Sequence, residues 1–159
     1  MSVAEVLALR REGKHHEARA RALSLLQAAP DDAELQFQTA CVHDYLGLEA
    51  ESVPFYRAAL AGRLDPAHRR QAFLGLGSTL RVLARYPESE AVLAEGLREF
   101  PDANELKVFM AMTLHNRGRS KEAVELLLRL VAATSADPEV RAYGRAIEFY
   151  AQDVERTWP

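Results

Sequence analysis

Apolar and small residues recur along this chain at fixed distances from four turn positions. The turn positions are Gly13, Gly47, Ala84 and Gly118. Thirteen residues after each turn stands an aliphatic residue, namely Leu26, Leu60, Leu97 or Val131. Polar and charged residues fill many of the positions between. Apolar residues spaced in this way predict helices that each bury one side.

Small residues mark two further positions of the same pattern. Five residues after the turns stand Ala18, Ser52, Ser89 and Ala123, and seven before them stand Val6, Ala40, Gly77 and Ala111. Two helix axes approach closely where no bulky side chain separates them. The pattern therefore predicts four helical hairpins over residues 3–30, 33–64, 70–101 and 104–135.

The turns are 34 residues apart in the first and last pairs and 37 apart in the middle. We expect the additional residues, near 61–66, to lengthen only the connection between the second and third hairpins. Proline disfavours helix in the residue before it, so the second helices should end at or near Pro30, Pro66, Pro101 and Pro138. Aspartates 31, 32 and 102 follow two of these prolines and are candidate N-caps.

The C-terminal segment predicts one amphipathic helix from Pro138 to about Glu155. Its apolar residues, spaced by three or four, are Val140, Tyr143, Ile147 and Tyr150. Since this helix has no partner in sequence, we expect it to cap the last hairpin. Trp158 follows it and has two interpretations: it packs back on the last hairpin, or it docks on another chain.

A helix–turn–helix unit of about 34 residues is typical of the tetratricopeptide repeat. The chain resembles this superfamily from about residue 3 to 131, most closely at Leu76-Gly77, Tyr86 and Pro101. The family's bulky aromatic near each repeat's start is mostly missing, and serines 52 and 89 replace the usual alanine. The resemblance implies an all-α fold, an α-α superhelix of about four hairpins plus a C-terminal capping helix, within a single domain of residues 1–159.

Three stretches also resemble a group of short, stand-alone bacterial repeat proteins that has no assigned biochemical activity. They are His-Asp-Tyr-Leu-Gly at 43–47, Leu-Gly-Ser-Thr-Leu-Arg at 76–81, and Phe-Tyr-Ala-Gln-Asp at 149–153 with Trp158. This narrower resemblance supports the fold and leaves the function open. The bias of the composition toward Arg over Lys and toward Ala and Leu is compatible with a bacterial origin.

Composition and charge narrow the classes of function. The formal net charge of −3 gives no basic face for nucleic acid. A single cysteine, Cys41, forms no internal disulfide and fits a reducing compartment. No stretch approaches the ~20 apolar residues of a membrane span, and the first residues do not resemble a secretory signal. We therefore expect a cytoplasmic protein that binds neither nucleic acid nor membrane.

The first hairpin is locally basic. Its cationic residues are Arg10, Arg11, Lys14, Arg19 and Arg21, with His15 and His16 beside them, and glutamates 5, 12 and 17 are interleaved. We interpret this surface as solvated and ion-paired. The alternative is contact with an acidic partner.

Residues that would carry catalysis or bind a metal are sparse. Cys41 and His43 are two apart on a predicted helix and so point to different sides. His15 and His16 are adjacent at a turn rather than on one helix face. Gly75 and Gly77 lie within a helix rather than in a phosphate-binding loop. The sequence predicts no enzyme, no cofactor and no metal site.

In the tetratricopeptide superfamily the first helix of each hairpin lines a concave groove. This resemblance implies a partner-binding groove containing Phe37, Cys41, Asp44, Tyr45, Leu74, Ser78, Arg81, Met112, His115 and Asn116. Phe37, Leu74 and Met112 would supply apolar contact. Asp44, Ser78, Arg81, His115 and Asn116 would supply polar contacts. Asp44 and Arg81 either neutralise each other in a structural ladder, or Arg81 receives an acidic group of the ligand together with Arg10 and His115.

The clamp by which some members hold a chaperone's C-terminal carboxylate falls here on Val3, Leu7, Gln38, Gln71 and Gly75. None of these is lysine, arginine or asparagine, so we do not expect such a clamp. The sequence predicts a non-enzymatic protein–protein interaction module or scaffold that binds a peptide or helix of a partner protein. The alternatives are a homo-oligomer that associates through Trp158 or the first hairpin, and a small-ligand-binding protein.

Overall fold

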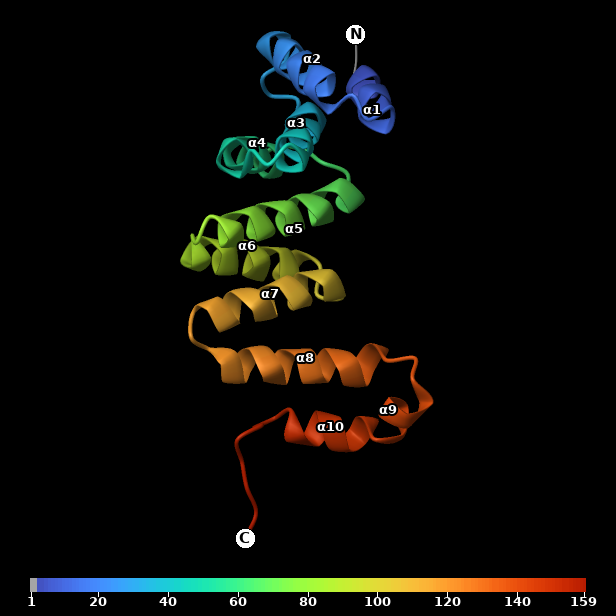
Figure 1. The fold of residues 1–159 in the computed structure, drawn as a ribbon, viewed down its shortest axis with the longest axis vertical. Helices are drawn as coiled ribbons and strands as arrows, with labels where there is room; N and C mark the ends of the chain where they lie inside the picture. Colours follow the sequence, from blue (N-terminus) through green and yellow to red (C-terminus); the bar gives the residue numbers. More distant parts are fainter. Residues whose placement is uncertain (1–2) are drawn as a thin grey trace. The chain divides into compact units, whose positions relative to one another are not determined.

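The computed structural model describes residues 3–159, and its regular structure over this range is helical (Figure 1). The helices are α1 (Val3–Arg11), α2 (His15–Ala28), α3 (Ala33–Tyr45), α4 (Glu49–Ala61), α5 (Pro66–Val82), α6 (Tyr86–Glu99), α7 (Asn104–Asn116), α8 (Ser120–Thr134), α9 (Pro138–Ala142) and α10 (Gly144–Tyr150). Consecutive helices pair as hairpins, among them α1 with α2, α3 with α4, and α7 with α8. The predicted all-α class, with the helix pairing of a tetratricopeptide superhelix, is confirmed.

The four turn positions share one backbone conformation. Gly13, Gly47 and Gly118 have φ of 75°, 72° and 76°, and Ala84 has φ of 57°. This left-handed conformation ends a helix by satisfying its last carbonyl groups, and it favours glycine because a Cβ atom is strained there. The register read from the sequence is therefore the register of the hairpins.

Contacts divide the chain into two compact units, one ending at Val92 and the other beginning at Leu93. The boundary falls inside α6, and each unit is described by itself below. The predicted single domain of residues 1–159 stays a prediction.

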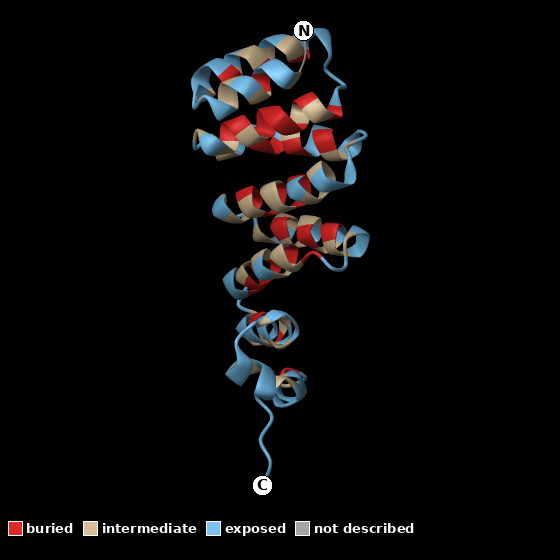
Figure 2. Ribbon diagram, turned by 90° about the vertical axis from the view of Figure 1, so that its right-hand side faces the viewer, coloured by how far each residue is buried: buried red, intermediate tan, exposed pale blue. Residues whose placement is uncertain are grey.

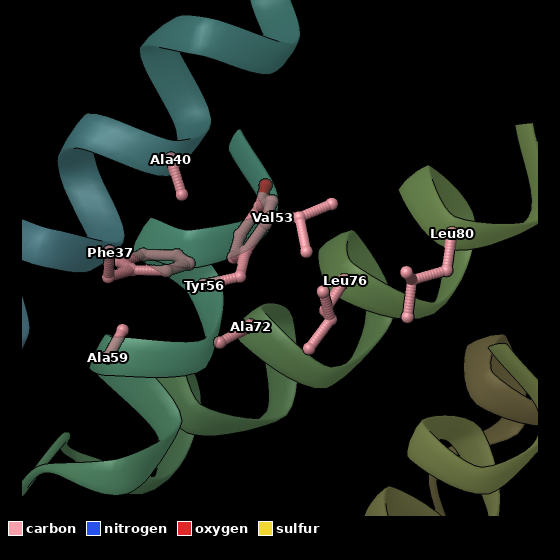
Figure 3. Packing of buried hydrophobic residues seen from close by; sticks show 8 residues of the cluster. All are labelled: Phe37, Ala40, Val53, Tyr56, Ala59, Ala72, Leu76 and Leu80. Carbon is pink, nitrogen blue, oxygen red and sulfur yellow. The ribbon is translucent and has the colours of Figure 1, made fainter. Parts of the chain in front are cut away.

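The first unit has a core built from three successive helices. Figure 3 shows Phe37 and Ala40 of α3, Val53, Tyr56 and Ala59 of α4, and Ala72, Leu76 and Leu80 of α5 packed together. A second cluster joins α1, α2 and α3 through residues that include Val6, Ala22 and Leu35. In α4 the buried residues Val53, Tyr56 and Ala59 are spaced by three, as the amphipathic pattern predicts, and Figure 2 shows buried and exposed residues along the same helices.

The second unit is held by α7, α8 and α10. Leu106 and Ala111 of α7 and Ala123 of α8 are buried, and α10 packs against α8. The predicted capping of the last hairpin is thus present within this unit.

The small positions five residues after the turns are all buried, as expected. The two serines add a hydrogen bond to close packing. Ser89 Oγ donates to the carbonyl of Gly77 at 2.7 Å, and Ser52 Oγ lies 2.7 Å from Asp44 Oδ1. These serines therefore keep the small volume of the family's alanine and attach the second helix to the first.

The insertion before the third hairpin is not a longer connection. It extends α5 to 17 residues, against 13 in α3 and α7, so the hairpin begins at Pro66 rather than at residue 70. Asp65 Oδ1 caps this helix by accepting from the amides of Ala67 and His68. Proline is favoured at the first position of a helix, which explains why Pro66 begins α5 instead of ending α4.

Two further expectations about helix ends are corrected. Asp32 caps α3 by accepting from the amide of Leu35, but the residue at the start of α7 is Ala103, so Asp102 is not its cap. The predicted single C-terminal helix is two short ones, separated at Tyr143. Gly144 lies at this break, where its conformational freedom weakens a continuous helix.

None of the helices in residues 3–159 has the length and hydropathy that a membrane span requires.

Candidate functional site

The predicted groove residues differ in how far a partner can reach them. Phe37 is only 3% exposed and belongs to the core of the first unit, where it contacts the rings of Tyr56 and His68. It is therefore a packing residue rather than a surface contact. Leu74, Ser78 and Arg81 of α5 are half-buried.

Asp44 lies at the centre of a hydrogen-bond network between three helices. Its carboxylate accepts from Ser52 Oγ at 2.7 Å, from Tyr56 Oη at 2.7 Å, and from Thr79 Oγ1 at 3.0 and 3.1 Å. Ser52 and Tyr56 belong to α4 and Thr79 to α5. These described partners are hydroxyl groups rather than Arg81, so Asp44 joins adjacent hairpins through neutral donors.

Two groups beside this network are weakly acidic. Burial raises the pKa of the Cys41 thiol, and the Tyr56 hydroxyl lies 4.0 Å from its sulfur. Burial, with the charges of Cys41 and Asp44, also raises the pKa of Tyr56. Both groups are therefore protonated at neutral pH, and Cys41 lacks the thiolate character of a nucleophile.

His43 is buried and engaged at both ring nitrogens. Its Nδ1 lies 2.8 Å from the carbonyl of Thr39, and its Nε2 accepts from Arg19 Nε at 3.0 Å. A carbonyl oxygen can only accept, so Nδ1 carries the hydrogen and Nε2 is the acceptor. His43 thus has no nitrogen directed at Cys41 for proton transfer.

Tyr45, at the last position of α3, is a strongly exposed member of the predicted set. It is 69% exposed, and its ring stacks on His15 with centroids 3.6 Å apart. Val82, at the equivalent position of α5, is 59% exposed. Two first helices of the first unit therefore end in a large, exposed apolar side chain.

Beside Tyr45 lies a surface hollow of about 350 Å³ lined by Leu7, Arg10, Arg11, His15 and Tyr45. Arg10 donates from Nη1 to Gln38 Oε1, which orients its guanidinium, and Arg11 is exposed. The hollow thus combines an aromatic wall with two cations. The sequence predicted a solvated, ion-paired surface for these arginines, with contact to an acidic partner as the alternative. Arg11 lies two residues before the turn Gly13, as Tyr45 does before Gly47, and Arg10 lies three before it, as Arg81 does before Ala84, although neither arginine was among the predicted groove residues.

The remaining candidates belong to the second unit. Met112 of α7 is half-buried, while His115 and Asn116 at the end of α7 are exposed. His115 Nδ1 lies 2.9 Å from Ser120 Oγ, at the start of α8.

Trp158 lies against the C-terminal aromatic residues and is also 48% exposed. Its ring stacks on Phe149 and meets Tyr150 edge to face, with both centroid distances 5.7 Å. The guanidinium of Arg156 lies 5.4 Å from the Trp158 ring centre. Both Phe149 and Tyr150 are 51% exposed, so we define these three aromatic residues as the C-terminal aromatic cluster.

Away from these surfaces, two carboxylates and an imidazole lie close together. One potential metal-ligand atom from each of Glu34, Asp65 and His68 lies within 4.8 Å of the other two. The three residues come from two helices and were not recognised in the sequence.

Hairpins with left-handed turns and small residues between the helices define a helical-repeat protein. A model of the family described as "Tetratrico peptide repeat" matches residues 33–154. The chain therefore belongs to the tetratricopeptide repeat family. No curated protein matches it in a sequence comparison. Repeats of this family generally mediate protein–protein interactions and are typically non-catalytic.

Proposed function

We propose that this protein is a non-enzymatic interaction module that binds a peptide or helix of a partner protein along its first helices. The observation that carries the proposal is the exposed Tyr45 beside the hollow that contains Arg10 and Arg11. Tyrosine and arginine are the residue types, with tryptophan, that dominate binding energy in protein interfaces.

The chemistry of the hollow defines the partner segment. Guanidinium groups pair with carboxylates through two parallel hydrogen bonds, so Arg10 and Arg11 favour an acidic side chain or a chain terminus. Tyr45 and Val82 favour an apolar side chain next to it. The proposed ligand is therefore a short segment in which an acidic residue neighbours an aliphatic or aromatic one.

Other exposed or half-buried candidates extend this proposal. In the first unit they are Cys41, Leu74, Ser78 and Arg81, with Asp44 supporting them from within its hydroxyl network. In the second unit, Met112, His115 and Asn116 offer the same mixture of apolar and polar contacts. Phe37 is not proposed as a contact because it is buried.

Selection from a random peptide library on the immobilised, untagged protein tests the proposal. We expect enrichment of peptides with an acidic residue beside an apolar one. Fluorescence polarisation with an enriched peptide should then show at least ~10-fold weaker binding for Arg11→Glu and for Tyr45→Ala, because each removes a central contact. Arg81→Glu reports whether α5 contributes.

Arg98→Glu is the matched control, since Arg98 is an exposed arginine on α6, the second helix of its hairpin, and the proposed contacts lie on first helices. It should bind as the wild type does. The proposal is wrong if no peptide is enriched, or if Arg11→Glu and Tyr45→Ala both bind with unchanged affinity.

Self-association is a second candidate function, favoured by the exposed C-terminal aromatic cluster. Sedimentation of the wild type beside Trp158→Ala, run in the same series, separates the two functions. An oligomer that dissociates in Trp158→Ala would support self-association. A monomeric wild type would contradict it and leave peptide binding unaffected.

A further inference from the structure

We propose that Glu34, Asp65 and His68 form a Zn²⁺ site that joins α3 to the start of α5. His68 Nδ1 lies 2.8 Å from Glu34 Oε2 and 2.8 Å from Asp65 Oδ2, and the three ligand atoms all lie within 4.8 Å of one another. The three side chains are 31 to 53% exposed, so an ion and its water ligands can reach them from solvent.

Each ligand is held by a second contact that leaves one atom directed at the cluster. Asp65 uses Oδ1 to cap α5, which leaves Oδ2 facing His68. Glu34 uses Oε1 to accept from Gln38 Nε2 at 2.8 Å, which leaves Oε2. Supporting hydrogen bonds of this kind orient the ligands of metal sites in proteins.

The imidazole is also fixed from one side. Its ring packs on Phe37 with centroids 4.9 Å apart and an interplanar angle of 30°. Because Phe37 is itself buried in the core, His68 is attached to a rigid part of the first unit.

The cluster holds two carboxylates, and a bound cation would offset their negative charge. Two carboxylate oxygens approach the same ring nitrogen, which carries at most one hydrogen. With a neutral imidazole, one carboxylate must share or lose that hydrogen bond. A divalent cation bound to all three atoms offers each lone pair a partner and offsets the two negative charges.

The ligand types favour zinc over the hard cations. Imidazole and carboxylate together suit Zn²⁺, whereas Ca²⁺ and Mg²⁺ prefer oxygen ligands alone. Tetrahedral Zn²⁺ with bonds of about 2.0–2.2 Å requires ligand atoms ~3.4 Å apart, so each carboxylate oxygen would move roughly half an ångström away from His68 Nδ1. Water would complete the four ligands.

The insertion in the third hairpin creates this site. The additional length of α5 carries His68, with Asp65 as the N-cap before it, and both lie against Glu34 in the first turn of α3. We infer that the bound ion would connect two successive hairpins and stabilise the first unit.

Titration of ZnCl₂ into untagged, metal-free protein tests the site by calorimetry. We expect one equivalent to bind the wild type, with at least ~10-fold weaker binding in His68→Ala and in Asp65→Ser. Serine is itself a good N-cap, so Asp65→Ser keeps the start of α5 while removing the ligand oxygen. Zn²⁺ should also raise the Tm of the wild type and not that of either variant, because a ligand that binds the folded state stabilises it.

His16→Ala is the matched histidine control, because His16 is exposed and outside the cluster. It should bind Zn²⁺ like the wild type. Glu34→Gln provides a third variant that keeps the acceptor for Gln38. The visible spectrum of Co²⁺ bound to the wild type reports coordination without any substitution, and an intense tetrahedral band is expected.

The proposal is wrong if the wild type binds no Zn²⁺ at millimolar concentration, or if His68→Ala binds it undiminished. Tighter binding of Ca²⁺ or Mg²⁺ than of Zn²⁺ would overturn the assignment of the ion.

Discussion

Helix faces are covered in different ways in the interior of the first unit and in the C-terminal cap. In α3, eight of the thirteen residues are buried, among them polar Gln38, Thr39 and His43. In α9 and α10, no residue is buried. The interior helix is therefore defined by packing on more than one side, and the cap by contacts along one edge.

Three polar side chains of α8 contact the cap. Lys121 pairs with Asp153 at 2.6 Å, and this ammonium, by hydrogen bonding to the carboxylate, lowers the pKa of Asp153. Glu125 accepts from the amide of Val154 at 3.1 Å. Arg129 donates to the carbonyl of Ala151, whose side chain is fully buried. Polar side chains of α8 therefore attach the cap, while its aromatic residues stay half-exposed.

Removal of apolar side-chain volume should give the largest difference in stability between the interior and the cap. Leu76, 2% exposed in the core of the first unit, contributes a buried isobutyl group. We expect Leu76→Ala to lower the free energy of unfolding by about 2–5 kcal/mol, since it leaves a cavity. Phe149→Ala, in the half-exposed aromatic cluster, should lower it by less than about 1 kcal/mol. Urea denaturation followed by circular dichroism measures both.

Equal destabilisation by the two substitutions would contradict the distinction between interior and cap. Leu76→Met keeps most of the volume and should restore most of the stability, which separates loss of packing from a general intolerance of substitution.

Removal of polar groups should change stability less, and again it should affect the first unit and the second unit differently. Asp44→Ala removes the acceptor for the hydroxyls of Ser52, Tyr56 and Thr79, and unpaired polar groups in a packed site are costly. We expect a loss of about 2–3 kcal/mol in the free energy of unfolding. Tyr56→Phe, which removes one donor and keeps the ring, should lose about 1 kcal/mol.

Glu122→Ala is the corresponding change in the second unit. Glu122 pairs with Arg119 at 2.6 Å on the surface, where salt and water screen the pair. Its replacement should give no measurable change in stability. Thermal unfolding in parallel would disprove the distinction if Glu122→Ala and Asp44→Ala shifted the Tm equally.

The hairpins were predictable because their turns depend on single residues. Only glycine readily adopts the left-handed conformation, so three of the four turns can be recognised in the sequence by their glycine. The buried small residues follow the same register. The start of α5 was missed because a proline can either follow the end of one helix or begin the next. The pair Asp65-Pro66 is a helix-start signal, but it was interpreted as part of a connection.

The candidate site was less predictable because burial depends on neighbours from other helices. Phe37 and the half-buried Leu74 each lie ten residues before their turn, and only the packing of Tyr56 and His68 around Phe37 places it in the core. The metal-ligand cluster likewise joins Glu34 to His68, 34 residues away. The sequence showed only Asp65 and His68 at helical spacing.

Changes of backbone conformation give small effects and the sharpest comparison between the two regions. Gly47, at a turn of the interior hairpin, has φ of 72°, and a Cβ atom there would meet nothing within 4 Å. Gly47→Ala therefore changes backbone strain alone and should lower the free energy of unfolding by about 1 kcal/mol. Ala84 already carries this strain at φ of 57°, so Ala84→Gly should raise stability by up to about 1 kcal/mol.

In the cap, a Cβ atom on Gly144 would meet only the carbonyl of Ala132, at an ordinary 4.0 Å, and φ there is not left-handed. Gly144→Ala should therefore stabilise α10 by about 0.5–1 kcal/mol, because alanine loses less conformational freedom on folding than glycine does. Chemical denaturation of the three variants tests the signs directly. Opposite signs for Gly47→Ala and Gly144→Ala would show that the interior turns require glycine for its conformation, whereas the cap merely tolerates it. Destabilisation by Gly144→Ala would instead mean that the break between α9 and α10 is a constrained turn.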